Sequence, residues 1–238
     1  MTINVNEIFT SFQGEGLSAG MPCAFLRLAG CNLHCSWCDT WYAWNFSDDE
    51  PTRWGLPTAK KKDECNSWTV EETARKLSKL GTDRLVVTGG EPLMQQPAIV
   101  ELIGNLLTSL YRGIEVETNG TLAPTEDLVK LVSQFNVSPK LISSGNVQKI
   151  AYRPEVLKIF EATGKANFKF VVATEDDVKE VERIVRDCDL TTVLLMAKGS
   201  TRETQEALTP DVKAWVKARG WIFSPRLHVL KYGDKRGV

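Results

Sequence analysis

Short apolar runs that alternate with amphipathic stretches constrain the fold of this chain more than any other feature. Six runs predict strands, and each is apolar at most positions, as expected for strands that are covered on both faces. They span residues 23–28, 84–88, 113–117, 137–142, 167–172 and 192–196. Between them, Thr69 and Thr174 each open a capping-box pattern, and Thr209 precedes a proline at a predicted first helical position. The alternation predicts parallel βαβ units with right-handed crossovers.

Two segments interrupt this strand–helix pattern. Residues 1–22 form an N-terminal extension with a polar Gln-Gly-Glu-Gly turn, and residues 41–68, which carry four of the seven tryptophans, are typical of a surface insertion. We find no repeat or linker in the 238 residues and expect a single domain, 1–238. The predicted α/β fold is a partial barrel or a wide open sheet, with its chemistry at the carboxyl ends of the strands.

Charge and hydropathy exclude several classes of partner. The 29 basic and 30 acidic side chains nearly balance, so no bulk electrostatic argument supports binding to nucleic acid or to a membrane surface. The first residues lack a basic region followed by an apolar one, and no apolar run is long enough to span a bilayer. We therefore expect a cytoplasmic protein whose six cysteines do not form disulfides.

Three of these cysteines, Cys31, Cys35 and Cys38, lie within eight residues directly after a predicted strand. Their Cys-x3-Cys-x2-Cys spacing allows three thiolates to surround one inorganic centre, and a cationic centre would keep them deprotonated. A 4Fe–4S cluster normally takes four cysteines. Three close ligands without an obvious fourth therefore favour a cluster in which one iron is open to an exchangeable ligand.

Two alternatives for this loop stay open. Structural zinc would use His34 as a fourth ligand, but all four ligands would then lie within eight residues, whereas structural zinc sites usually join two separated pairs. An iron–sulfur electron carrier would need a fourth cysteine, for which Cys23 and Cys65 are the nearby candidates. The spacing favours the three-cysteine cluster over both.

The cysteine spacing, with Trp37 just before the last cysteine, resembles the signature of the radical S-adenosylmethionine enzymes. Gly89-Gly90-Glu91-Pro92 resembles their second motif, which receives the methionyl amino group. Nearly the whole chain further resembles the 7-carboxy-7-deazaguanine synthase family. The matching segments are residues 7–16, 25–33, 38–40, 88–92, 117–120, 138–140 and parts of 227–238. The Gln-Gly-Glu-Gly turn and Ser138-Pro-Lys140 narrow the superfamily to this family.

This resemblance implies a partial (β/α)6-type barrel and three cofactors: one 4Fe–4S cluster per chain, S-adenosylmethionine and Mg²⁺. It implies a radical ring contraction that converts 6-carboxy-5,6,7,8-tetrahydropterin into 7-carboxy-7-deazaguanine with release of ammonia. This is a lyase reaction of 7-deazapurine (queuosine precursor) biosynthesis. The implied protein partners are an electron donor, such as flavodoxin or ferredoxin, and a second copy of the chain in a homodimer.

The resemblance also implies roles for individual residues. Cys31, Cys35 and Cys38 would ligate the cluster, and the Thr40 hydroxyl would ligate Mg²⁺. The residues expected at S-adenosylmethionine are Ser36, Trp37, Asp39, Gly89, Gly90, Glu91, Ser138, Pro139 and Lys140. The residues expected at the substrate are Phe12, Gln13, Gly14, Glu15, Arg27, Thr88, His228 and Val238, the last two on a C-terminal tail (224–238) that closes the site.

Structural roles compete with some of these functional ones. Arg27 lies on a buried strand, so its guanidinium either binds the substrate carboxylate or forms a structural ion pair, for which Glu15 is a candidate. Met196-Ala-Lys-Gly199 departs from the Met-Pro-x-Gly of many family members, which puts a cofactor contact there in doubt. A different small radical S-adenosylmethionine enzyme, such as a glycyl-radical activase, would share the cysteine loop but has no evident use for Gln13 and Glu15.

Overall fold

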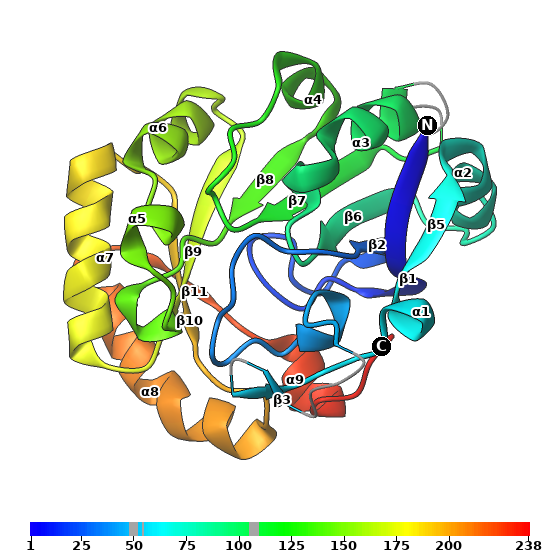
Figure 1. Ribbon diagram of the computed structural model, residues 1–238. Helices are drawn as coiled ribbons and strands as arrows, with labels where there is room; N and C mark the ends of the chain where they lie inside the picture. The colour runs from blue at the N-terminus through cyan, green and yellow to red at the C-terminus, as the bar shows by residue number, and fades with distance from the viewer. Residues whose placement is uncertain (48–51, 54, 105–109) are drawn as a thin grey trace.

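The computed structural model describes residues 1–47, 52–53, 55–104 and 110–238. Its centre is a curved nine-stranded sheet with the strand order β11-β10-β9-β8-β7-β6-β2-β1-β5 (Figure 1). The strands of this sheet are β1 (Thr2–Phe12), β2 (Pro22–Leu28), β5 (Asn66–Thr69), β6 (Arg84–Gly89), β7 (Gly113–Thr118), β8 (Gln134–Val137), β9 (Ala166–Val172), β10 (Val193–Ala197) and β11 (Ile222–Ser224). A separate antiparallel pair is formed by β3 (Thr52–Arg53) and β4 (Leu56–Pro57).

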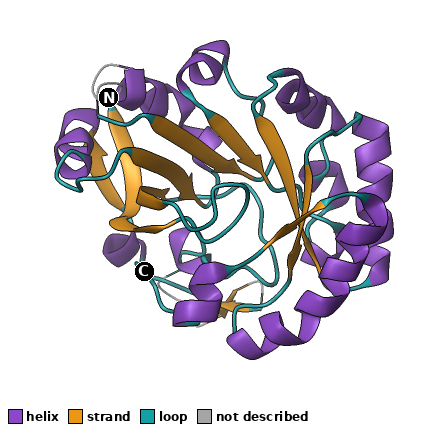
Figure 2. Cartoon of the chain, turned by 180° about the vertical axis from the view of Figure 1, so that it is seen from behind, coloured by secondary structure: helices purple, strands orange, loops and turns teal. Residues whose placement is uncertain are grey.

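Helices surround the sheet while loops gather at its centre (Figure 2). The α-helices are α1 (Lys61–Glu64), α2 (Val70–Leu77), α3 (Gln96–Leu102), α4 (Glu126–Leu131), α5 (Gln148–Ala151), α6 (Pro154–Ala162), α7 (Glu175–Cys188), α8 (Arg202–Arg219) and α9 (Leu227–Tyr232). The 3-10 helices are η1 (Trp41–Ala43), η2 (Pro92–Gln95) and η4 (Ile142–Ser144). In the described part of the chain, no helix combines the length and apolar character needed to cross a membrane.

The central part of the sheet is parallel, as the alternating pattern predicts. β2 pairs with β6, and from there each strand runs parallel to the next through β7, β8, β9, β10 and β11. In the described residues β11 lies at one end of the sheet and β5 at the other, so the sheet is curved but not closed. The expected α/β fold, a partial barrel, is confirmed.

The N-terminal extension is itself part of this sheet. β1 pairs antiparallel with β2, with Phe9 opposite Phe25, and its first residues pair with β5. Because β5 comes from the 41–68 segment, that segment is only partly a surface insertion. Residues 48–51 and 54 of this segment lie outside the described residues.

One predicted strand has the wrong bounds. The prediction placed it at 137–142, but β8 ends at Val137, and Ile142 begins η4. Pro139 explains the difference, because proline has no N–H to donate to a strand ladder. β1, β5 and β11, which are the antiparallel or outermost strands of the sheet, are absent from the predicted strands.

The helix-start signals were correct at two positions and wrong at one. Thr69 and Thr174 each cap a helix in a complete capping box. Thr209 caps nothing, because α8 already begins at Arg202, where Thr201 forms the capping box, and Pro210 lies inside the helix. A proline inside a helix costs a hydrogen bond but does not always end the helix, so the Thr-Pro signal was ambiguous.

The two faces of the sheet differ in chemistry. On β9, Phe168 and Phe170 are fully buried in the apolar core that the helices cover, while Lys169 between them lines the interior of the curve. Strand side chains alternate between faces, so this order places the lysine inward. Thr88 and Glu117 on neighbouring strands line the same interior. The result is an apolar layer outside the sheet and a polar cavity inside it.

Candidate active site

A cavity of about 660 Å³ occupies the interior of the curved sheet. It brings together most of the residues that the sequence singles out, although they come from segments as far apart as the first strand and the C-terminus. All the predicted site residues line it except Ser36, Glu91 and Pro139. Met196, Lys198 and Gly199 of the departing Met-Ala-Lys-Gly segment also lie on its wall.

The three cysteines of the loop face this cavity as free thiols. Each sulfur accepts one N–H: Cys31 from the Leu33 backbone at 3.4 Å, Cys35 from Asn146 Nδ2 at 3.1 Å, and Cys38 from Trp44 Nε1 at 3.2 Å. Burial raises the pKa of Cys31 to about 12, so this thiol stays protonated unless a cationic centre binds it. Three cavity-facing sulfurs with N–H donors fit the ligand set of a 4Fe–4S cluster.

Neither alternative for the loop gains support from the described residues. His34 does not line the cavity, and its ring lies edge-on against Trp44 with centroids 5.1 Å apart. Cys23 is fully buried on β2 in a small apolar cluster with Phe25, and Cys65 follows α1. Neither cysteine lines the cavity, so the geometry favours three sulfur ligands rather than four.

The predicted glycine pair lies directly against the cysteine loop. Gly89 has a φ of +145°, and a Cβ there would lie 2.2 Å from the Leu28 carbonyl oxygen. A Cβ on Gly90 would lie 2.1 Å from the carbonyl oxygen of Gly30, just before Cys31. Only glycine allows this approach of two backbones, which leaves the backbone of the pair exposed to the cavity.

Glu91 lies behind this wall rather than on it. Its carboxylate accepts hydrogen bonds from Thr118 Oγ1 at 2.8 Å, Asn119 N at 2.6 Å and Leu93 N at 3.0 Å. Burial raises the pKa of Glu91, although these hydrogen bonds favour the charged form. In this structure Glu91 therefore fixes the loop after β7 against the loop after β6.

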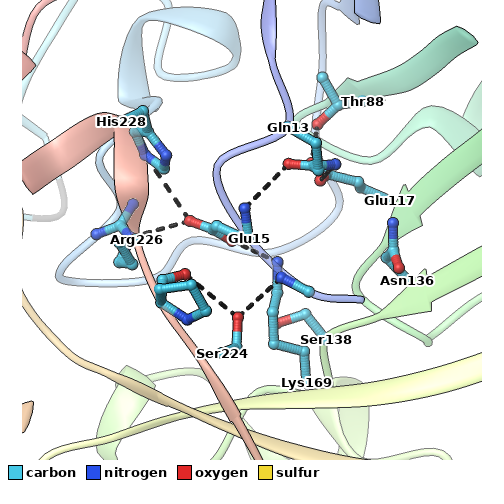
Figure 3. Close-up of polar contacts among 12 residues, drawn as sticks. Gln13, Glu15, Thr88, Glu117, Asn136, Ser138, Lys169, Ser224, Arg226 and His228 are labelled. Carbon is cyan, nitrogen blue, oxygen red and sulfur yellow. Dashed lines mark hydrogen bonds and ion pairs between the residues drawn. The ribbon is translucent and has the colours of Figure 1, made fainter. Parts of the chain in front are cut away.

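Opposite charges cluster around Glu15 at one side of the cavity (Figure 3). Its carboxylate forms ion pairs with Lys169 and with Arg226 Nε at 2.9 Å, and His228 Nε2 lies 3.8 Å away. Arg226 also pairs with Asp39. Burial opposes ionisation of Glu15, but the two cations outweigh it and hold the pKa of Glu15 well below its usual range. Glu15 is therefore ionised in this structure.

A second carboxylate, that of the partly buried Glu117, lies near this cluster (Figure 3). Gln13 Nε2 donates to Glu117 Oε1 at 3.1 Å, and Thr88 Oγ1 donates to Glu117 Oε2 at 2.7 Å. Gln13 and Thr88 are predicted site residues, whereas Glu117, which joins them, is not. Lys169 is also absent from the prediction, although a lone lysine in an apolar strand is a signal because it needs a buried partner.

Arg27 pairs with a different acid from the one expected. Its Nε donates to Glu7 Oε1 at 2.8 Å, across the β1–β2 pair, so the pairing with Glu15 is wrong. The reason is register: Glu7 lies directly opposite Arg27 on β1. Arg27 still lines the cavity, so the ion pair does not remove it from the site.

The remaining predicted residues also occupy defined positions. Lys140 Nζ donates to the carbonyl and the hydroxyl oxygen of Ser138, each at 2.8 Å. Thr40 Oγ1 lies 3.6 Å from Cys38 Sγ. His228 packs so closely on Gly14 that a Cβ there would lie 2.0 Å from His228 Nδ1. Each of these residues lines the cavity.

The end of the chain is fixed beside the same cavity. Arg236 donates to both carboxylate oxygens of Glu64, at 2.9 and 2.8 Å, and its guanidinium lies 3.5 Å from the centroid of the Tyr42 ring. This bidentate ion pair joins the C-terminal tail to the end of α1, and Val238 lies on the cavity wall. Sequence spacing gives no hint of this contact.

Comparisons with known proteins agree with this geometry. Residues 26–140 match the Radical SAM superfamily. The 7-carboxy-7-deazaguanine synthase of Pyrobaculum aerophilum is 38% identical over 99% of this chain and 97% of its own length. That of Hyperthermus butylicus is 35% identical over 96% of this chain and 92% of its own. The crystal structure of QueE from Escherichia coli has a TM-score of 0.72 at 24% identity, covering 96% of this chain and 95% of that one.

The partial barrel, the cysteine loop and the superfamily match define a radical S-adenosylmethionine enzyme, which uses a 4Fe–4S cluster and S-adenosylmethionine. Within that class, the similarity to relatives over nearly the whole length shows that the chain belongs to the 7-carboxy-7-deazaguanine synthase family. It is therefore a lyase of queuosine-precursor biosynthesis that makes 7-carboxy-7-deazaguanine and also uses Mg²⁺. The resemblance found in the sequence is confirmed.

Proposed function

We propose that the cavity converts 6-carboxy-5,6,7,8-tetrahydropterin into 7-carboxy-7-deazaguanine, with cofactors and substrate held on different walls. The observation that carries this proposal is the shared cavity: the three loop cysteines and the Glu15 and Glu117 carboxylates all line it. When bound, the cluster and S-adenosylmethionine supply one-electron and radical chemistry that no side chain supplies. The chain's own residues position the reactants and exclude water.

Cys31, Cys35 and Cys38 would hold the cluster, and Thr40 beside Cys38 would offer a hydroxyl oxygen to Mg²⁺. The exposed backbone at Gly89 and Gly90 would accept S-adenosylmethionine close to the loop. Further contacts would come from four residues on the cavity wall, Trp37, Asp39, Ser138 and Lys140. Ser36 and Pro139 lie off this wall and would act only by supporting their neighbours in the chain, and Glu91 would act by fixing the glycine turn.

The substrate would lie against the two carboxylates. The amino-pyrimidinone edge of a pterin presents N–H donors, for which the carboxylate oxygens of Glu15 and Glu117 are acceptors. Lys169 and Arg226 hold the Glu15 charge in place, as Thr88 and Gln13 hold Glu117. This set of contacts explains why so many charged side chains are buried here.

The substrate carboxylate needs a cationic partner at the other end of the ring system. Arg27 is suited to this, because Glu7 occupies only its Nε edge among the described contacts. Phe12, Gly14, His228 and Val238 would complete the substrate site. The tail supports this closure, since the Leu227 N–H donates to the Gly14 carbonyl at 2.9 Å, which joins the tail to the Gln-Gly-Glu-Gly turn.

The family resemblance also supports a proposal on partners and location. We expect a homodimer in the cytoplasm, reduced by a small electron carrier such as flavodoxin or ferredoxin. Size-exclusion chromatography with light scattering tests the dimer, and turnover with each purified carrier in place of dithionite tests the donor. Neither result affects the assignment of the residues that line the cavity.

The decisive experiment incubates anaerobically reconstituted enzyme with the carboxytetrahydropterin, S-adenosylmethionine, Mg²⁺ and dithionite, and follows the products by mass spectrometry. We expect 7-carboxy-7-deazaguanine and ammonia. The Glu117→Gln variant should raise the KM for the pterin about tenfold, a loss of about 1.4 kcal/mol, while binding of S-adenosylmethionine stays unchanged. Glu126→Gln, on an exposed helix start, is the matched control. Cluster-loaded enzyme that forms no deazapurine would overturn the proposal.

A further inference from the structure

Two side chains outside the cysteine signature point N–H groups at its sulfurs. Trp44 Nε1 lies 3.2 Å from Cys38 Sγ, and Asn146 Nδ2 lies 3.1 Å from Cys35 Sγ. Trp44 follows η1 in the 41–68 segment, and Asn146 lies 111 residues after Cys35 along the chain. The cofactor ligation that we propose does not account for either donor.

Asn146 is held in the orientation that makes this contact. Its Oδ1 accepts the His34 backbone N–H at 2.8 Å, and its Nδ2 also lies 3.0 Å from Ser144 Oγ. The amide thus joins the cysteine loop to the segment after η4. Trp44 is similarly constrained, because its ring is buried and packs against His34. Neither donor can turn away without loss of other contacts.

Hydrogen bonds to cysteine sulfurs affect an iron–sulfur cluster in a known direction. The reduced cluster carries one more negative charge than the oxidised cluster, so an N–H donor stabilises the reduced form more and raises the reduction potential. A single donor lost from a buried sulfur therefore makes the cluster harder to reduce.

We infer that Trp44 and Asn146 are positioning residues that act through Cys38 and Cys35 to raise the reduction potential of the cluster, an inference that rests on the cluster ligation proposed above. They set how readily a one-electron donor reduces the enzyme. Because they act on the sulfurs, their effect is present before any substrate binds.

The test measures the reduction potential of reconstituted enzyme by redox titration with electron paramagnetic resonance detection, before S-adenosylmethionine is added. We expect Trp44→Phe, which keeps an aromatic ring against His34, to lower the ratio of reduced to oxidised cluster about tenfold at a given potential. For a one-electron couple, this ratio corresponds to a reduction potential that is lower by about 59 mV. Trp68→Phe is the matched control, because Trp68 lies on β5, packs against the apolar core and does not line the cavity. Its potential should equal that of the unmodified enzyme.

A second variant keeps the inference testable if Trp44→Phe fails to take up the cluster. Asn146→Asp retains an oxygen for the His34 N–H and loses the donor to Cys35. Its potential should fall further than that of Ser143→Asp, which adds a negative charge at an exposed neighbouring position without removing a donor. Iron analysis and thermal melting verify that each protein is loaded and folded.

The outcomes separate this inference from the proposed function. Cluster-loaded variants with unchanged potentials, or an Asn146→Asp shift no larger than that of Ser143→Asp, overturn the inference and leave the proposed function standing. If the unmodified enzyme takes up no cluster at all, the proposed function itself fails.

Discussion

The cavity has two walls that are built in different ways. The wall that we propose for the cofactors, called the cofactor wall here, consists of the Cys31–Cys38 loop and the Gly89-Gly90 turn, each a short stretch of chain at the end of a strand. The wall that we propose for the substrate, called the substrate wall, consists of Gln13, Glu15, Glu117, Lys169 and Arg226, and Glu15 lies 154 residues from Lys169 and 211 from Arg226. The first wall depends on local backbone geometry, and the second depends on the whole sheet being formed. Substitutions in the two walls should therefore have different effects on cofactor content, stability and substrate binding.

The largest expected effect is on the cofactor wall. Cys35→Ala removes one of three sulfur ligands, and we expect it to lose the cluster and all turnover while the protein stays folded, because the thiol contributes little to the apolar core. Iron and sulfide analysis, the visible spectrum and circular dichroism measure this. Cys65→Ala, outside the cavity, is the control and should behave like the unmodified enzyme. Full turnover by Cys35→Ala would exclude the ligand role.

A smaller effect, on stability rather than on cofactor content, is expected on the substrate wall. Glu15→Gln leaves Lys169 and Arg226 without their shared carboxylate in a buried site, so the free energy of unfolding should fall by about 3 kcal/mol. Chemical denaturation measures this. Adding Lys169→Met should recover part of the loss, because it removes the unpaired cation. Equal stability of Glu15→Gln and the unmodified enzyme would show that the ion-pair cluster is not structural.

The free energy of unfolding should depend on pH differently in the unmodified enzyme and in Glu15→Gln. The pKa of Glu15 is lower in the folded protein than its ordinary value of 4.5. Its stabilising contribution is therefore fully present above pH 4.5 and decreases as the pH falls below that value toward the folded pKa. The difference in free energy of unfolding between the unmodified enzyme and Glu15→Gln, measured by chemical denaturation at a series of pH values, should therefore become smaller as the pH falls below 4.5.

The smallest effect is expected at Arg27, which lies on β2 opposite Glu7 of β1 and lines the cavity. Arg27→Ala should raise the KM for the substrate about tenfold, close to 1.4 kcal/mol, without weakening binding of S-adenosylmethionine. Steady-state kinetics and calorimetry measure the two quantities. Glu7→Gln, which removes the ion-pair partner but keeps the arginine, should leave most of the substrate affinity. If Arg27→Ala weakens both ligands equally, Arg27 is only structural.

Sequence patterns identify the cysteine loop and the glycine pair more readily than the charged cluster around Glu15, for a physical reason. Cysteine spacing and a glycine pair are local patterns, so Cys31 and Gly90 can be recognised from a few neighbouring residues. Arg226 has no comparable pattern around it, because its partners Glu15 and Asp39 reach it only through the folded sheet. Lys169 is an intermediate case: its place between Phe168 and Phe170 in an apolar run is a signal that it needs a partner, but the prediction overlooked it, and the run does not say which partner.

The same distinction applies to the fold. The parallel strands were predicted because double burial leaves continuous apolar runs. β1 was missed because it lies among antiparallel neighbours and its second half is only partly buried, so its pattern is weak there. The end of β8 was misplaced because apolar residues continue beyond Pro139, where the backbone leaves the sheet.

The contacts of the cysteine loop have a consequence for how the protein is made in the cell. Ser36 N donates to the Ser144 carbonyl at 2.9 Å, and His34 N donates to Asn146 Oδ1. Translation delivers the three cysteines more than a hundred residues before these acceptors, so a nascent chain carries its thiols in an unformed loop. The loop can therefore take the shape described above only after residue 146 has been made, and until then the three thiols have none of these contacts.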